Sequence, residues 1–173
     1  MEKIKTGLAA FGMSGQIFHA PFISTNPAFC LTAITERNKN LSKERYPSAR
    51  IVRSFEELVA LDELELVVIN TPDSTHYEYT RKALEAGKNV LCEKAFTVNA
   101  DQARKLFALA KEKNLLITEA IWTRYMPSRK MIDDIISSGV IGEVTAVTAN
   151  LNYAISEVER IRKPELAGGA LLD

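Results

Sequence analysis

The sequence predicts an α/β fold with a Rossmann-type, doubly wound parallel sheet, followed by the truncated start of an α+β second domain. Three observations support this fold class: short apolar segments alternate with helix signals, a glycine-containing turn follows the first apolar segment, and the pattern changes after about Trp122. Apolar residues make up 46% of the 173 residues, which is enough for a substantial core. We therefore expect one complete domain over residues 1–121 and an incomplete one over 122–173.

The predicted strands are short apolar segments of the kind that parallel sheets bury on both faces. We expect six strands with helices between them, and five are placed at residues 4–10, 29–35, 66–69, 90–92 and 115–118. Two helices are predicted at residues 14–24 and 40–45. Three more are predicted to begin at the capping boxes Ser54 with Glu57 and Thr75 with Glu78, and at Asn99 with Gln102. Gly87 suits the left-handed residue that ends a helix.

The second part begins with a predicted amphipathic helix around residues 131–136, stopped by Gly139, and a long alternating strand at 143–153. No further strand is available to pair with the strand at 143–153. Either the chain is a fragment, or another chain completes the sheet as a homo-oligomer, because unpaired strand edges recruit partners.

The 22 basic and 22 acidic side chains cancel, so neither a nucleic acid nor an anionic membrane surface is expected as partner. Cys30 and Cys92 lie in strand-like segments and are predicted to be small buried residues in a reducing compartment. The start of the chain carries no signal-peptide core, so we expect a cytoplasmic protein. Two cysteines and two distant histidines give no metal cluster.

The turn after the first strand reads Ala10-Phe11-Gly12-Met13-Ser14-Gly15 and matches the dinucleotide fingerprint GxGxxG, except that alanine replaces the first glycine. Gly12 would let the backbone approach a pyrophosphate, and Gly15 would let the helix pack close to the strand. Ala10 must then avoid a positive φ. A degraded fingerprint is also compatible with a packing turn and no ligand.

Glu36 ends the second strand, at the spacing of about 20 residues at which an acidic side chain accepts both ribose hydroxyl hydrogens. This favours NAD. The adjacent Arg37 could instead pair with a 2′-phosphate, which keeps NADP as the alternative. A solvated turn is the third alternative for this pair.

Glu93 and Lys94 follow the apolar strand at 90–92, at the carboxyl edge where ligands bind in open parallel sheets. A lysine there can donate a proton or polarise an oxygen. The alternative is a solvated pair of loop residues.

Several spaced motifs resemble the Gfo/Idh/MocA family of nicotinamide-dependent oxidoreductases over about residues 4–173. The motifs are Phe18-His19-Ala20-Pro21-Phe22, Asn70-Thr71-Pro72-Asp73-Ser74-Thr75-His76 and Ala86-Gly87-Lys88-Asn89-Val90-Leu91-Cys92-Glu93-Lys94. The segments 119–127 and 168–173 are similar to the branch that contains dihydrodiol dehydrogenases.

The resemblance implies hydride transfer between NAD or NADP and a secondary alcohol or carbonyl of a sugar, polyol or diol. It implies Lys94 and Asp173 as catalytic residues and Trp122 and Arg124 as substrate residues. The implied cofactor-binding residues are Gly12, Met13, Ser14, Gly15, Glu36, Arg37, Thr71, Pro72, His76, Glu93 and Lys94.

Two departures from the family pattern matter. Ala95 replaces the proline that usually follows the lysine, so we expect a trans Lys94–Ala95 bond, because a non-proline cis bond costs about 2.5–4 kcal/mol. Asp173 is the last residue, whereas the histidine or tyrosine partner in the family motif lies four residues further on. For the chain by itself we expect weak or no turnover, and a non-catalytic nucleotide-binding fragment or sensor module is the alternative function.

Overall fold

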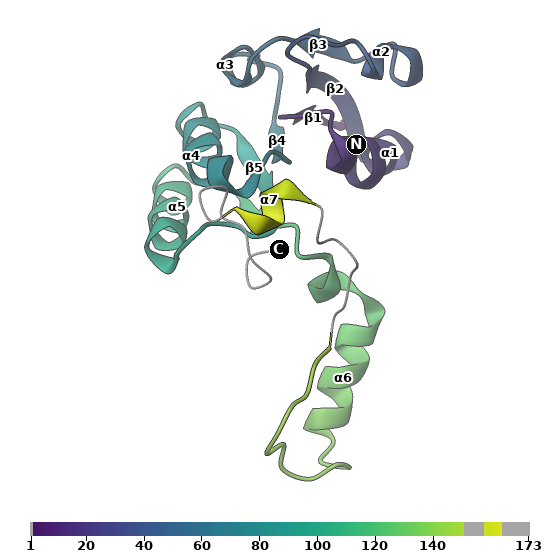
Figure 1. Ribbon diagram of the computed structural model, residues 1–173, viewed down its shortest axis with the longest axis vertical. Coiled ribbons are helices and arrows are strands. Elements are labelled where there is room, and N and C mark those ends of the chain that lie inside the picture. Colours follow the sequence, from purple (N-terminus) through teal and green to yellow (C-terminus); the bar gives the residue numbers. More distant parts are fainter. Residues whose placement is uncertain (1, 151–157, 164–173) are drawn as a thin grey trace.

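The computed structural model describes residues 2–150 and 158–163, and six of its segments form one fully parallel sheet (Figure 1). The strands are β1 (Ile4–Leu8), β2 (Phe29–Thr35), β3 (Arg50–Val52), β4 (Leu66–Ile69), β5 (Asn89–Cys92) and β6 (Ile117–Glu119). Their order in the sheet is β3-β2-β1-β4-β5-β6. This is the doubly wound order of dinucleotide-binding folds, and the predicted fold class is confirmed.

Helices connect the strands on both faces of the sheet. They are the π-helical turn η1 (Gly15–His19), α1 (Ala20–Thr25), α2 (Ser42–Arg45), α3 (Phe55–Val59), the 3-10 turn η2 (Asp73–Thr75), α4 (His76–Glu85), α5 (Ala100–Glu112), the 3-10 turn η3 (Trp122–Tyr125), α6 (Pro127–Ser137) and α7 (Glu159–Arg162). In the described part of the chain, no helix is both long enough and apolar enough to cross a bilayer.

Two apolar clusters, one on each face, hold the sheet and helices together. Successive strand residues contribute to opposite clusters, as the two-residue period of a strand requires: Val67 and Ile69 belong to one, and Val68 belongs to the other. The first cluster includes buried residues of α3, α4 and α5, and the second includes those of α1. Burial on both faces explains why the central strand β4 is continuously apolar.

Local sequence signals agree with the structure at several helix ends. The Ser54 hydroxyl accepts from Glu57 N, the side-chain Oδ1 of Asn99 accepts from Gln102 N, and Gly87 has a φ of 76°. The capping box at Thr75 was wrong, because its hydroxyl donates to Pro72 O instead. The backbone of the preceding 3-10 turn places Pro72 O within reach of that hydroxyl.

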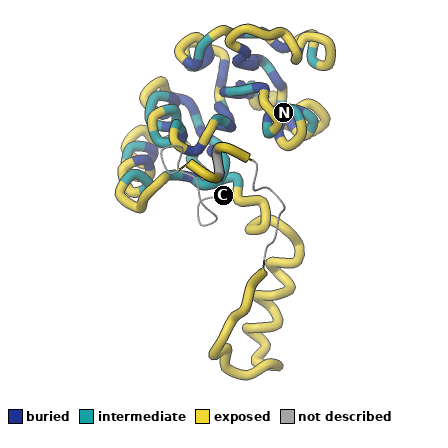
Figure 2. Tube along the Cα trace, in the orientation of Figure 1, coloured by how far each residue is buried: buried dark blue, intermediate teal, exposed yellow. Residues whose placement is uncertain are grey.

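Residues 121–150 are exposed throughout, and α6 extends away from the sheet (Figure 2). The helix itself and its end at Gly139, with a φ of 71°, are confirmed. The strand predicted at 143–153 was wrong over 144–150, which has no regular structure, and 151–153 lie outside the described residues. Alternation alone does not make a strand, because the backbone hydrogen bonds of a strand need a second strand.

The two cysteines differ in burial. Cys92 is buried, and burial raises the pKa of its thiol to about 12. Cys30 is exposed, so the prediction that both would be buried was wrong for this residue. Cys30 lies near the amino end of β2, whereas the fully buried residues Ala33 and Ile34 lie further along the strand.

Candidate functional site

The carboxyl ends of four strands gather the residues that the sequence singled out. The glycine-containing turn follows β1, Glu36 follows β2, the segment Asn70 to His76 follows β4, and Glu93 with Lys94 follows β5. Because β1 and β4 are neighbours and the chain winds in opposite directions from them, this edge is where an open α/β sheet binds its ligand.

The turn after β1 is held by Asn70 at the end of β4. Ala10 N donates to Asn70 Oδ1 at 3.0 Å, and Asn70 Nδ2 donates to Ala10 O at 2.9 Å. A Cβ on Gly15 would lie 2.5 Å from Ala10 O and 2.8 Å from Asn70 Nδ2, so a side chain cannot fit there. Among the described non-glycine residues only Asn114 has a positive φ, so the prediction for Ala10 is confirmed.

Gly12 has a different environment from Gly15. A Cβ on Gly12 would meet no atom within 4 Å, and the residue is exposed at the surface of the turn. The turn therefore needs Gly15 for close packing and has open space beside Gly12, as a pyrophosphate-binding turn requires. These residues fit a dinucleotide, with Met13 exposed and Ser14 half-buried between the two glycines.

Glu36 is 6% exposed, and its carboxylate is occupied by protein donors. Leu41 N donates to Oε2 at 2.8 Å, and Ser42 donates to Oε1 from its N at 2.9 Å and from its hydroxyl at 2.5 Å. Burial acts to raise the pKa of this carboxyl, but these bonds and the charge of Arg53 outweigh it and the pKa is lowered. In this arrangement Glu36 closes the loop after β2 and does not present two free oxygens to a ribose.

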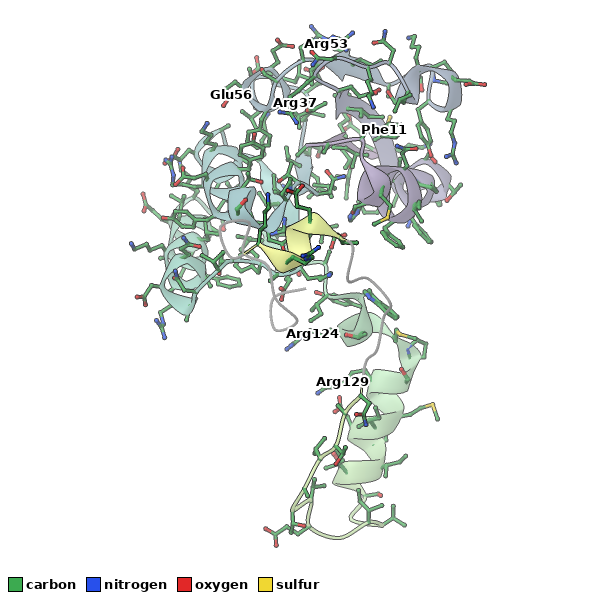
Figure 3. All side chains as sticks on the ribbon, in the orientation of Figure 1. Phe11, Arg37, Arg53, Glu56, Arg124 and Arg129 are labelled. Carbon is green, nitrogen blue, oxygen red and sulfur yellow. The ribbon has the colours of Figure 1, made fainter. Side chains whose placement is uncertain are left out.

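Arg53 holds the same loop from the strand end of β3. Its guanidinium donates to Glu36 O at 2.8 Å, to Lys39 O at 2.7 Å and to Asn40 Oδ1 at 2.7 Å. Arg37 lies in this loop, is exposed, and has no side-chain partner among the described residues. Arg37 and Arg53 both lie in the part of the molecule that contains β2 and β3 (Figure 3). The loop therefore has a fixed backbone and one available guanidinium.

His76 is completely buried at the start of α4 and connects two strand-end segments. Its Nε2 lies 2.9 Å from Thr71 O, and its Nδ1 lies 2.6 Å from Ala95 O. The ring therefore lies between two backbone carbonyl oxygens, one at each of its nitrogens. The buried ring of His76 thus connects the segment after β4 to the segment that carries Lys94.

Thr71 and Pro72 lie between these segments, closer to the surface. Thr71 is half-buried with its hydroxyl 2.7 Å from that of Thr75, and Pro72 is exposed. Both can contact a ligand at the edge of the sheet, whereas the ring of His76 cannot do so without moving.

Glu93 connects the Lys94 segment to the turn after β1. Its Oε1 lies 2.7 Å from His19 Nε2 and accepts from the Ser14 hydroxyl at 3.2 Å, and its Oε2 accepts from Lys94 N at 3.2 Å. Burial acts to raise the pKa of the Glu93 carboxyl, but the hydrogen bond and charge of His19, with the other two donors, lower it. Lys94 itself is half-buried beside this carboxylate.

The Lys94–Ala95 peptide bond is cis, so the expectation of a trans bond was wrong. That expectation considered only the preference of an isolated non-proline peptide. In the fold, residues from other elements hold the next peptide unit, Ala95–Phe96: Ala95 O faces His76, and Phe96 N donates to Glu119 Oε1 at 2.9 Å. Contacts between distant segments set the conformation of this turn.

The structure does not bring every expected residue to the strand ends. Trp122 and Arg124 lie in η3, exposed, beyond the end of β6, and Figure 3 shows Arg124 near the base of the arm that carries α6. Asp173 lies outside the described residues. Within residues 2–150 and 158–163, no three His, Cys, Asp or Glu side chains come together as metal ligands.

Sequence reasoning assigned no role to three residues that hold the site: Asn70, Ser42 and His19. Asn70 had a usable signal, because a polar residue directly after a buried strand faces the carboxyl edge. Ser42 and His19 had none, since their partners Glu36 and Glu93 are fixed only by the folded geometry.

Comparison with known proteins identifies the class of protein. Residues 4–120 match the Gfo/Idh/MocA family model, described as "Oxidoreductase family, NAD-binding Rossmann fold". This match covers more than half of the chain, and the chain belongs to that family.

The relatives of the chain include sugar and diol dehydrogenases of the family. The chain is 46% identical to D-xylose 1-dehydrogenase (NADP(+)) of Hypocrea jecorina over 135 residues, covering 72% of this chain and 34% of the relative. It is 33% identical to trans-1,2-dihydrobenzene-1,2-diol dehydrogenase of Xenopus tropicalis over 138 residues, covering 80% and 42%. The resemblance to the branch containing dihydrodiol dehydrogenases is thereby confirmed.

A solved structure shares the arrangement. The 3-ketoreductase KijD10 of Actinomadura kijaniata, in complex with NADP and TDP-benzene, superimposes with a TM-score of 0.77 at 30% identity, covering 82% of this chain and 44% of that protein. The chain spans less than half the length of each of these three proteins.

Proposed function

We propose that this chain is the cofactor-binding part of an NADP-dependent oxidoreductase that interconverts a secondary alcohol and a carbonyl of a sugar, polyol or diol. Residues 1–121 form the cofactor domain, and 122–173 begin the substrate domain. The observation that carries the proposal is the connection through Glu93, whose carboxylate accepts from Ser14 in the turn after β1 and from the backbone N of Lys94.

Lys94 is the group that acts on the reacting oxygen. When bound, the nicotinamide cofactor supplies or accepts the hydride. In the carbonyl direction the ammonium group of Lys94 stabilises the negative charge that grows on the oxygen. In the alcohol direction the same charge favours loss of the hydroxyl proton to a neighbouring base, a role for which Asp173 remains the candidate.

Two features of the loop after β2, together with the relatives, support NADP over NAD. The carboxylate of Glu36 is already satisfied by protein donors, so a ribose diol would have to displace them. The guanidinium of Arg37 is exposed and matches a 2′-phosphate in geometry and charge. The D-xylose dehydrogenase and the 3-ketoreductase named above are both described with NADP.

The proposal is tested with the full-length gene product by following absorbance of reduced cofactor against a panel of aldoses, inositols and vicinal diols. We expect turnover with NADP⁺, a loss of about 10³-fold or more in kcat for Lys94→Ala, and little change in NADPH affinity. Lys105→Ala, an exposed lysine on α5, is the matched control and retains wild-type rates. Absence of turnover with every substrate, or a Lys94→Ala variant as fast as wild type, would contradict the proposal.

Cofactor choice has its own test. Arg37→Ala is expected to weaken NADPH binding by about 10-fold to 100-fold, since a charge-assisted phosphate contact is worth roughly 1.5–3 kcal/mol, and to leave NADH binding unchanged. The control is Arg45→Ala on α2, another exposed arginine. Equal losses for both cofactors in Arg37→Ala would argue against a contact with the 2′-phosphate.

A further inference from the structure

A buried histidine outside the implied cofactor and catalytic residues faces the carboxylate that precedes Lys94. His19 is 7% exposed at the end of η1, and its Nε2 lies 2.7 Å from Glu93 Oε1. The two residues are 74 positions apart in the sequence, so this contact exists only in the folded chain. We propose that His19 is a positioning residue, which fixes the Glu93 carboxylate and through it the Lys94 turn against the phosphate-binding turn.

The bonding around Glu93 supports this role. Oε1 is shared by two groups from the segment after β1, His19 and the Ser14 hydroxyl, while Oε2 accepts from Lys94 N. One carboxylate thus connects the backbone of the lysine turn to the first turns of the helix that follows the glycines. The His19 contact is the shorter of the two on Oε1, at 2.7 Å against 3.2 Å.

Because both side chains are largely buried, loss of the contact between His19 and Glu93 should disturb the turn that carries Lys94. The side chain of His19 is 8% exposed and that of Glu93 is 17% exposed, so water replaces a lost partner poorly at this position. A buried carboxylate that loses a donor either keeps an unsatisfied oxygen or shifts toward solvent. In both cases the carboxylate is held less firmly, and so is the backbone amide of Lys94, which donates to the other oxygen of the same carboxylate.

Only the expected effect of His19 on catalysis rests on the proposed function. The positioning of the Lys94 turn by His19 through Glu93 is a property of the cofactor-free protein. His19→Leu keeps an apolar side chain of similar bulk but removes the donor. His19→Gln is the conservative variant, because its amide nitrogen can reach the position of Nε2. Ser24→Ala, on the exposed side of α1, is the control, since within the described residues the Ser24 hydroxyl bonds only to Pro21 O of its own helix.

The first readout is amide hydrogen exchange of residues 93–96 in the cofactor-free protein. We expect exchange in this turn to rise about tenfold or more in His19→Leu, to return to within about threefold of wild type in His19→Gln, and to stay unchanged in Ser24→Ala. Faster exchange confined to residues 15–25 in His19→Leu would overturn the proposal, because His19 would then support only its own helix. Failure of His19→Gln to restore protection would overturn it as well.

The second readout is kinetic and separates positioning from general stability. In His19→Leu we expect kcat to fall about tenfold or more while NADPH affinity changes by less than about threefold, and we expect no further fall when His19→Leu is added to Glu93→Gln. Additive effects of the two substitutions would contradict action through Glu93. If the wild type neither binds NADPH nor turns over, the proposed function fails, and the exchange experiment still decides whether His19 positions the turn.

Discussion

Alanine substitutions at the two glycines of the turn after β1 should have different effects, because Gly15 and Gly12 are needed for different reasons. In Gly15→Ala the new Cβ would lie 2.5 Å from Ala10 O, which is backbone, and 2.8 Å from Asn70 Nδ2. Neither atom is the end of a flexible side chain: Ala10 O belongs to the turn, and Asn70 is fixed by two hydrogen bonds to Ala10. The turn must therefore shift away from β4.

The expected cost follows from the crowding. Inserting a methyl group into a tightly packed place costs about 1–3 kcal/mol, and partial loss of the paired bonds between Ala10 and Asn70 puts this site in the upper half of that range. With a urea m-value of roughly 2 kcal/mol per M, the midpoint of unfolding should fall by about 1–1.5 M. Displacement of the turn should also weaken NADPH binding about tenfold or more.

Gly12→Ala is the matched control, because its Cβ would meet no protein atom within 4 Å. Its urea midpoint should stay within about 0.2 M of wild type, while its affinity for NADPH falls, since the methyl group enters the space where the pyrophosphate approaches. Urea unfolding followed by circular dichroism and NADPH titration followed by fluorescence measure the two effects. Equal stability of Gly15→Ala and Gly12→Ala would refute the assignment of Gly15 to packing.

Other predictions concern the buried polar groups and thiols. Ser42→Ala removes the buried hydroxyl bonded to Glu36 and should destabilise the fold by about 1–3 kcal/mol in urea unfolding, with no loss expected for the exposed Ser48→Ala. The pKa of Glu36 is lowered in the fold, so its stabilising contribution is present above its usual value of 4.5 and is lost as the pH falls through the lower folded value. Glu36→Gln should accordingly lose less stability than wild type between pH of about 6 and about 3, and equal losses would contradict this. Because burial raises the pKa of Cys92 to about 12 whereas Cys30 is exposed, a thiol reagent at pH of about 8 should modify Cys30 alone in the folded protein; prompt reaction of both thiols would contradict the burial of Cys92.

Much of the fold follows from local sequence signals. The strands β2, β4 and β5 are largely apolar segments, and helix ends are recognisable at Ser54, Gly87 and Asn99. The strand β3 was not located, since three residues, Arg50 to Val52, are too few to show a period. Its position depends on pairing with β2.

The position of the candidate site could be predicted from the sequence, but its internal bonding could not. Lys94 and Thr71 follow buried strands, and that position alone places them at one edge of a parallel sheet. The sequence could not show that the carboxylate of Glu36 turns inward to Ser42, because a strand-end glutamate can bond either its own loop or a ligand. The cis bond at Ala95 depends likewise on distant contacts.

The most direct test of the central claim is a crystal structure of the protein bound to NADP⁺. We predict the pyrophosphate against Gly12 to Gly15, the 2′-phosphate beside Arg37, and the nicotinamide beside Lys94, with the Glu36 carboxylate still bonded to Ser42. A cofactor bound away from this edge of the sheet, or a Glu36 side chain turned outward to bind the ribose, would contradict the account.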